Sequence, residues 1–192
     1  MSRRLAVVRR RVAEVLDGDE RQRALRILSL CAGDGRDVLA ELEARPDLDA
    51  PTVLVELDEV LAQRARVRAT GRRDVEVRQG DAGDTETFAD AVPVDLLLLC
   101  GIFGNISDAD IATTVAAAPA MLAEGGTVIW TRGVFESGQD LRRTIRRWFT
   151  EAGLEEVAFD GAPERFGVGV ARRPVGNRCV SALPARLFTF AR

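Results

Sequence analysis

The sequence contains no lysine, no histidine and no tyrosine, so all 27 of its basic residues are arginine. Histidine, lysine and tyrosine are among the side chains that most often transfer protons in enzymes. Any proton transfer at a catalytic site of this chain therefore depends on a carboxylate, a thiol or water. A GC-rich coding sequence also produces an arginine-only composition, so the composition by itself indicates no function.

Cysteine and long apolar runs are also scarce. Three cysteines, at positions 31, 100 and 179, form an odd set with no paired spacing, which argues against a disulfide framework and against a zinc site, and we expect no metal. No apolar run approaches the roughly 20 residues of a membrane helix. The N-terminal stretch has only four consecutive apolar residues, Leu5 to Val8, too few for a secretory signal. We expect a cytoplasmic protein without a membrane partner.

Positive charge is not in excess, because the net charge is -3. Nucleic-acid binding depends largely on neutralising phosphates with basic side chains. The arginines cluster at positions 3, 4 and 9 to 11, and again at 142, 143, 146 and 147. No aromatic platform is interleaved with either cluster, so we interpret both as solvated helix faces and do not expect a nucleic-acid partner.

Apolar periodicity predicts strands alternating with helices, which is typical of βαβ crossovers and a parallel sheet. The expected strands are 26–30, 52–57, 75–79, 94–100, 126–132, 154–159 and 186–191, and the expected helices are 5–16, 37–44, 59–70, 85–91, 108–122 and 140–153. No crossover helix precedes 186–191, so we expect that last strand to be antiparallel. The glycine-alternating stretch within 161–185 is a candidate strand or lid edge.

The predicted fold class is therefore α/β, a doubly wound, seven-stranded, mainly parallel sheet with an antiparallel last strand and helices on both faces. A length of 192 residues suits one domain. We expect residues 1–192 to form it, with an N-terminal helix in 1–18, a cofactor-binding half in 25–132, and the substrate side and C-terminal strands in 133–192.

The first predicted strand leads into "CAGDGRD", where ligands bind in an open α/β sheet. Gly33 and Gly35 permit positive φ, and the next helix offers free N–H groups. Glu56, at the end of the second strand, is placed to accept hydrogen bonds from ribose hydroxyls. A dinucleotide fold would place a third glycine at Val38, so nicotinamide cofactors are disfavoured.

Five segments together carry a family resemblance; in order they are "ILSLCAGDGRDVL", "VLVELDEVLAQRAR", "RQGDA", "DLLLLCGIFGNISDAD" and "LAEGGTVIW". From about Leu25 to Ala191 the chain resembles the class I S-adenosylmethionine-dependent methyltransferases, which have a Rossmann-like fold. Their first strand ends in acid-x-Gly-x-Gly-x-Gly. Here the two later glycines match, whereas Ser29 stands at the acid and Cys31 at the first glycine.

The resemblance implies S-adenosylmethionine as the cofactor. It places Glu56 at the ribose, Asp81 at the adenine amino group, Ala82 near the ring, and the backbone of Cys100 and Gly101 at the methionine part. The expected cofactor site comprises Ser29, Cys31, Ala32, Gly33, Asp34, Gly35, Glu56, Leu57, Asp81, Ala82, Cys100 and Gly101.

Residues that follow the fourth and fifth strands are expected to bind the acceptor: Phe103, Asn105, Arg132 and Phe135. The phenylalanines serve either as pocket walls or as ordinary packing. Asn105 either orients a substrate or caps the helix at Asp108, and Arg132 either pairs with a substrate anion or is solvated. No catalytic residue is assigned. Cys31 and Cys100 are not expected to be nucleophiles, because nothing cationic in sequence lowers their pKa.

The function that this sequence favours is methyl transfer from S-adenosylmethionine to a small molecule by a monomer or homodimer. Departure of a neutral thioether needs no acid, so positioning alone supplies much of the catalysis. Two alternatives remain open: a non-catalytic or regulatory protein that binds the same cofactor, and an RNA methyltransferase. A nicotinamide dehydrogenase ranks last.

Overall fold

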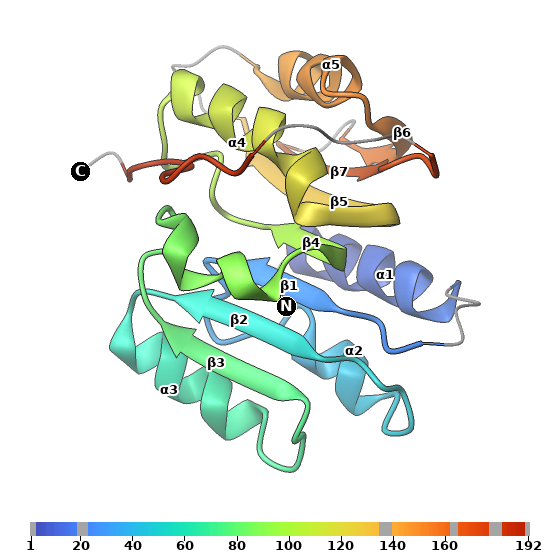
Figure 1. The fold of residues 1–192 in the computed structure, drawn as a ribbon, viewed down its shortest axis with the longest axis vertical. Helices are drawn as coiled ribbons and strands as arrows, with labels where there is room; N and C mark the ends of the chain where they lie inside the picture. The colour runs from blue at the N-terminus through green and yellow to red at the C-terminus, as the bar shows by residue number, and fades with distance from the viewer. Residues whose placement is uncertain (1–2, 19–22, 135–139, 162–164, 177–181, 191–192) are drawn as a thin grey trace.

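A computed structural model describes residues 3–18, 23–134, 140–161, 165–176 and 182–190. Its centre is one seven-stranded sheet in the order β3-β2-β1-β4-β5-β7-β6 (Figure 1). The strands are β1 (Ile27–Leu30), β2 (Thr52–Glu56), β3 (Val75–Gln79), β4 (Val94–Leu99), β5 (Leu122–Gly133), β6 (Glu155–Asp160) and β7 (Phe166–Arg172). The first five run parallel, so their carboxyl ends share one edge, and β7 runs antiparallel to β5 and β6.

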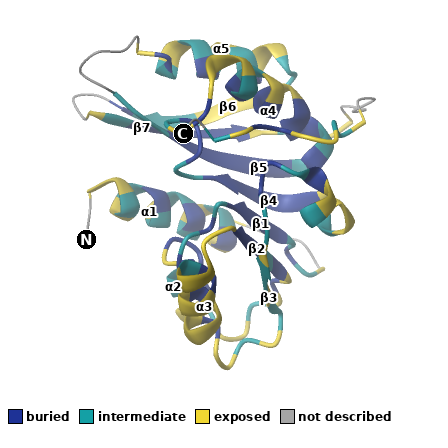
Figure 2. Cartoon of the chain, turned by 90° about the vertical axis from the view of Figure 1, so that its left-hand side faces the viewer, coloured by how far each residue is buried: buried dark blue, intermediate teal, exposed yellow. Residues whose placement is uncertain are grey.

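Helices cover both faces of this sheet (Figure 2). They are α1 (Arg3–Asp17), α2 (Leu39–Glu43), α3 (Glu59–Arg68), α4 (Asp108–Met121) and α5 (Arg142–Glu151), with two 3₁₀ turns, η1 (Thr85–Thr87) and η2 (Ala89–Ala91). The 3₁₀ turns occupy the segment where one short helix was expected. The doubly wound α/β fold with a single antiparallel strand is confirmed.

Strand β4 shows why the sheet needs cover on both sides, since all six of its residues are buried. Leu96 and Leu98 join the cluster beneath α1, α2 and α3, whereas Leu97 and Leu99 join the cluster beneath α4 and α5. Successive side chains of a strand point to opposite faces, so a continuous apolar run fills two cores at once.

The antiparallel strand lies in a different segment from the one predicted, so the expectation of a strand over 186–191 is wrong. Strand β7 is the glycine-alternating stretch, and it forms a hairpin with β6. Its glycines are needed because aromatic rings lie against them: a Cβ on Gly169 would come within 2.2 Å of the Trp130 indole. Glycine has no apolar side chain, so a strand with glycine at alternate positions lacks the apolar pattern that predicts strands.

Residues 182–190, which we call the C-terminal strap, run past α4 in Figure 1 and make only isolated bridges, to Asp84 and Ile106. The Leu187 N–H donates to the Gly83 carbonyl at 2.8 Å, and the Thr85 N–H donates to the Ala185 carbonyl at 3.1 Å. Leu187 and Phe188 are each 1% exposed. Packing between the β3–η1 loop and α4, rather than strand pairing, buries these apolar residues.

Among the described residues, none of the helices is both long and apolar enough to cross a membrane.

Candidate functional site

The turn after β1 is built from three left-handed residues. Cys31, Gly33 and Gly35 have φ values of 55°, 58° and 69°. Cys31 takes the conformation that favours glycine, although it bears a side chain. A Cβ on Gly35 would come within 2.6 Å of Leu39, whereas a Cβ on Gly33 would meet no atom within 4 Å. The backbone at Gly33 therefore faces open space, and that at Gly35 packs against the core.

The Glu56 side chain fixes this turn by hydrogen bonds to its backbone. Its carboxylate accepts hydrogen bonds from the N–H groups of Gly33, at 2.7 Å, and Asp58, at 2.9 Å. The side chain is buried, and it links the ends of β1 and β2. A carboxylate has about four acceptor positions, so these two bonds leave capacity for ligand hydroxyls.

A cavity of about 330 Å³ opens above the turn, at the carboxyl edge of the sheet. The N-terminal part of α1 forms one wall, and the residues after β1 and β4 form the others. The Thr131 hydroxyl on β5 accepts from the Gly101 N–H at 2.9 Å and so fixes the turn after β4. Gly101 has φ 84°, and a Cβ there would also meet nothing within 4 Å.

The cavity is lined by Arg4, Leu5, Val8, Cys31, Ala32, Gly33, Asp34, Arg36, Asp37, Leu61, Cys100, Gly101 and Thr131. It brings together six of the residues predicted to bind the cofactor, from the turn after β1 and the turn after β4. Arg4, Asp37 and Thr131 were not predicted. Asp37 lies two residues after Gly35, so its place in the glycine turn was the available signal.

Two acidic residues of the cavity wall differ sharply in their surroundings. Both oxygens of Asp34 accept from Arg36, at 2.6 and 2.8 Å, and these bonds lower the pKa of the carboxyl. Asp37 is buried, and its Oδ1 accepts from the Val38 N–H at 2.9 Å. Burial raises the pKa of Asp37 to about 6. At neutral pH both carboxyls are ionised, but only for Asp37 is ionisation less favourable than in water, because of burial.

The two cavity cysteines are protonated at neutral pH. Burial, with smaller contributions from Glu56 and Asp81, raises the pKa of Cys31 to about 12. Burial also raises the pKa of Cys100 well above its ordinary value, and Asp37 adds to the effect. Since the thiolate is the nucleophile, neither residue is suited to covalent catalysis at neutral pH.

Asp81 lies beyond β3 on the same edge of the sheet. Its Oδ1 accepts from the Gly83 N–H and its Oδ2 from Arg186 of the C-terminal strap, each at 2.8 Å. Burial opposes ionisation, but Arg186 and Gly83 outweigh it and lower the pKa of Asp81. The strap thus orients a carboxylate predicted for the cofactor site.

Other predicted cofactor residues have mixed surroundings. Ser29 is 1% exposed in β1, and its hydroxyl has no hydrogen-bond partner among the described residues. Leu57 follows Glu56 and is 57% exposed, whereas Ala82 is buried in the core beneath α4. Glu56, Leu57, Asp81 and Ala82 do not line the 330 Å³ cavity.

The residues predicted to bind the acceptor are not brought together in the cavity. Phe103 is fully buried and packs on Trp130 at a ring distance of 6.1 Å, so it is a core residue rather than a pocket wall. Arg132 is partly buried and donates to the Phe103 carbonyl; burial lowers its pKa. Phe135 lies outside the described residues.

Asn105 is exposed and donates to the Gly101 carbonyl at 2.7 Å. It does not cap α4, because the Ser107 hydroxyl accepts from the Asp110 N–H and fills that position. Asn105 instead ties the loop after β4 back to the turn at Gly101.

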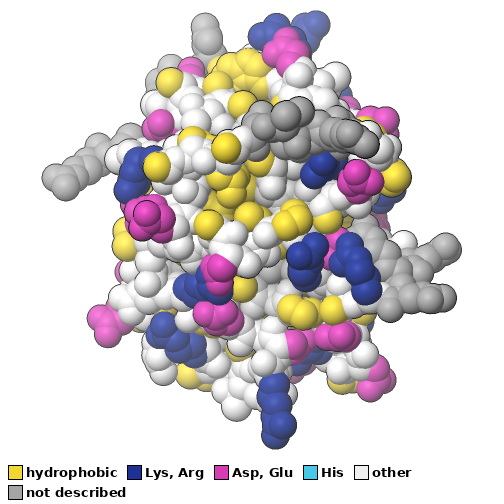
Figure 3. Space-filling model, in the orientation of Figure 1, with side chains coloured by type: hydrophobic (Ala, Val, Ile, Leu, Met, Phe, Trp, Pro, Cys, Tyr) yellow, Lys and Arg dark blue, Asp and Glu magenta, His cyan; other side chains and the backbone are white. Residues whose placement is uncertain are grey.

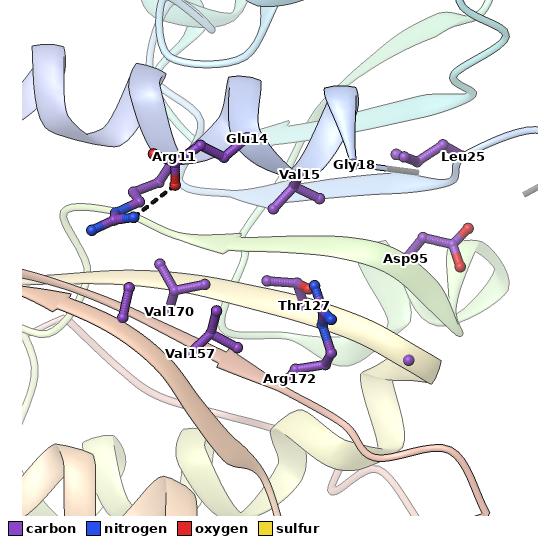
Figure 4. Close-up of a pocket in the computed structure, with 12 residues that line it drawn as sticks. Arg11, Glu14, Val15, Gly18, Leu25, Asp95, Thr127, Val157, Val170 and Arg172 are labelled. Carbon is purple, nitrogen blue, oxygen red and sulfur yellow. Dashed lines mark hydrogen bonds and ion pairs between the residues drawn. The ribbon is translucent and has the colours of Figure 1, made fainter. Parts of the chain in front are cut away.

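A smaller cavity of about 240 Å³ lies at the opposite edge, between the C-terminal half of α1 and strands β4 to β7 (Figure 4). Three of its four charged side chains pair within the fold: Arg11 pairs with Glu14 and Asp160, each at 2.7 Å, and Asp95 pairs with Arg23 at 2.6 Å. Ligands of open α/β sheets bind at the carboxyl edge, so the 330 Å³ cavity beside the glycine turn is the candidate site. No group of three or more potential metal ligands occurs among the described residues.

Comparison with known proteins decides the family. Residues 2–140 match the model of a family described as "Putative methyltransferase". The chain belongs to this family. A search of curated proteins finds no match. Family membership and fold agree with the class I resemblance of the sequence.

Solved structures of methyltransferases share the fold at low identity. An O-methyltransferase family protein from Burkholderia thailandensis has a TM-score of 0.70 and 16% identity, with 91% of this chain and 57% of that chain covered. An O-methyltransferase family 2 protein from Planctomyces limnophilus, in complex with apigenin, has a TM-score of 0.66 and 20% identity, with 88% of this chain and 58% of that chain covered. Magnesium protoporphyrin IX methyltransferase from Synechocystis, with bound S-adenosylmethionine, has a TM-score of 0.68 and 13% identity, with 88% of this chain and 79% of that chain covered. This chain thus spans little more than half the length of the first two.

Proposed function

We propose that this protein transfers a methyl group from S-adenosylmethionine to a small molecule. One observation carries the proposal: two turns with open, left-handed glycines, at Gly33 and Gly101, face a cavity beside a buried carboxylate, Glu56. Close approach of backbone to a ligand is where glycine is required. Membership of a methyltransferase family supports the same conclusion.

The chain's residues fit the parts of this cofactor. Glu56 keeps acceptor capacity for the ribose hydroxyls, and Asp81, oriented by Arg186, offers a carboxylate for the adenine amino group. The exposed Leu57 supplies apolar surface for a purine. Cys31, Ala32, Asp34 and Gly35 shape the turn, Cys100 and Gly101 line the methionine end, and the unpartnered Ser29 hydroxyl lies in the strand beneath.

S-adenosylmethionine supplies an electrophilic methyl group on a sulfonium, and its leaving group is a neutral thioether. The chain then needs chiefly to hold the acceptor in line with that methyl, and such positioning can remove about 7–11 kcal/mol of the barrier. The rigid turns after β1 and β4, fixed by Glu56 and Thr131, suit this task. The acceptor's proton passes to a carboxylate or to water.

The domain assignment remains part of the proposal. Residues 1–192 form one methyltransferase domain, in which 25–132 bind the cofactor and 133–192 serve the substrate side together with the N-terminal helix. Cytoplasmic location, a monomer or homodimer, and the absence of a nucleic-acid partner remain predictions. Figure 3 shows basic and acidic side chains interspersed on one face, which gives no single-sign surface there for nucleic acid.

Turnover tests the proposal. Purified protein is incubated with radiolabelled S-adenosylmethionine and a panel of phenols, amines, thiols and carboxylic acids, and S-adenosylhomocysteine is quantified. We expect time-dependent product with at least one acceptor class. Cofactor binding without product across the panel would favour a non-catalytic binding protein, and product only with RNA fragments would favour an RNA methyltransferase. Absence of binding would contradict all three.

A further inference from the structure

The amino acid end of S-adenosylmethionine is a zwitterion, so a site that binds it well offers one negative and one positive group. Most charged side chains near the cavity are already paired. Asp34 is clamped by Arg36, and on α1 Arg9 pairs with Glu41 at 2.7 Å. The question is which charged groups of the wall lack an internal partner.

Asp37 is the negative group with that property. It lines the cavity and is only 9% exposed, yet among the described residues it makes no ion pair, and its hydrogen bonds come from backbone N–H groups, its own and that of Val38. A buried carboxylate without a cation costs stability, so such groups are normally paired. An ammonium ion in the cavity would supply the missing charge.

Arg4 is the positively charged group of the cavity wall that lacks an ion-pair partner among the described residues. It lies in the first turn of α1, lines the same cavity and, within the described ranges, has no ion pair. Its neighbour Arg3 lines a groove on the other side of α1, together with Arg10 and Arg142. Arg4, Asp37 and Cys100 line the same cavity, so the positive and the negative group face one ligand space.

We propose that Asp37 binds the α-ammonium group of the cofactor and Arg4 its α-carboxylate, so that α1 closes one end of the site. This inference rests on the proposed function and assigns the methionine end of that cofactor to two residues outside the glycine motif. Ser29, whose side chain is neutral, cannot supply the negative charge. The arginine fork of Arg4 matches a carboxylate in two parallel hydrogen bonds.

Calorimetry with three ligands tests the assignment: S-adenosylhomocysteine, its deaminated analogue and its decarboxylated analogue. Asp37→Asn should weaken the homocysteine compound and the decarboxylated analogue at least about tenfold, because both keep the amine. It should leave the deaminated analogue within about twofold. Arg4→Gln should weaken binding of S-adenosylhomocysteine and of the deaminated analogue, which keep the carboxylate, and should leave the decarboxylated analogue within about twofold. Arg3→Gln, the matched control, should not change the affinity for any of the three ligands.

The outcomes separate this inference from the proposed function. If wild-type protein binds none of the three ligands, the proposed cofactor is wrong. If wild-type protein binds S-adenosylhomocysteine but Asp37→Asn binds all three as well as wild type does, the assignment of Asp37 is wrong while the cofactor stands. Equal weakening of all three ligands also overturns it. Circular dichroism and thermal unfolding of each variant establish that it is folded.

Discussion

At the scale of single residues, the turn after β1 combines one backbone conformation with different surroundings. Positions 31, 33 and 35 are all left-handed, but Gly35 contacts Leu39 and Leu54, whereas Gly33 borders open space. The first position holds Cys31, whose partly buried side chain packs against the core. The three positions therefore have separable roles in folding and binding.

Gly33→Ala and Gly35→Ala should separate those roles. Left-handed alanine costs about 1–2 kcal/mol of folding stability at either position. Overpacking against Leu39 adds about 1–3 kcal/mol at Gly35 only. We expect Gly33→Ala to stay folded and to lose affinity for S-adenosylhomocysteine, because its methyl group enters the ligand space. Urea unfolding and calorimetry measure both quantities, and equal stability loss in the two variants would contradict the account.

Asp37→Asn should be more stable than wild type, although it binds the cofactor less well. The folded-state pKa of about 6 lies above the ordinary 3.8, so wild-type stability falls as pH rises between these values and the full penalty is present above pH 6. At about 1.4 kcal/mol per pKa unit, the variant should gain about 1–3 kcal/mol at pH 7.5 and less at pH 5.

The charged and titratable groups around Asp37 are Asp34 and Arg36 of its own turn, Arg4 of α1 and Cys100 after β4. Arg36 lowers the pKa of Asp34 and burial raises the pKa of Cys100, so neither titrates between pH 5 and 7.5, where Asp37 does. Urea unfolding of both proteins at the two pH values measures the difference. A gain that does not change with pH would show that burial of Asp37 is not its source.

Residues of the site were predictable where spacing alone identifies them. Glu56 follows the glycine turn at a distance typical of ribose recognition, and it proves to be buried against Gly33. Asp37 was missed because an aspartate after an arginine is typical of a solvated helix start; α2 begins instead at Leu39, and Asp37 lies buried in the turn before it. For Phe103 both a pocket wall and ordinary packing were left open, because sequence does not tell which way a loop aromatic points; its ring is buried against Trp130.

At the scale of elements, strands with unbroken apolar runs and helices with clear stripes were predicted within a few residues. Strand β7 was predicted only as a candidate strand or lid edge, because Gly167 and Gly169, required by Phe159 and Trp130, replace the apolar residues of its pattern. The C-terminal strap was taken for a strand because Leu187 and Phe188 have a strand-like composition. Their burial comes from packing beside η1 and α4, which no local pattern records.

Gly83→Ala should release the C-terminal strap. A Cβ at Gly83 would lie 2.2 Å from the Phe188 carbonyl oxygen, a backbone atom that cannot yield without displacing the strap. We expect a loss of about 1–3 kcal/mol of stability and weaker cofactor binding, because Arg186 no longer orients Asp81. Gly80→Ala is the control, since its Cβ would meet only the Thr87 side chain at 3.2 Å. Urea unfolding with equal losses in both variants would disprove the docking role.

At the scale of the whole molecule, one edge of the sheet gathers everything that the proposal needs. The turns after β1 and β4, the carboxylates after β2 and β3, and the first turn of α1 all meet there. Three of the four charged side chains that line the cavity at the opposite edge, Arg11, Glu14 and Asp95, pair within the fold (Figure 4). The proposal therefore assigns ligand binding to the carboxyl edge of the sheet.

Calorimetric titration of the wild-type protein with S-adenosylhomocysteine and, separately, with NAD⁺ tests the central claim most directly. The account predicts saturable binding of one S-adenosylhomocysteine per chain, weakened by Glu56→Gln, and no heat from NAD⁺. Saturable binding of NAD⁺ with no heat from S-adenosylhomocysteine would contradict it.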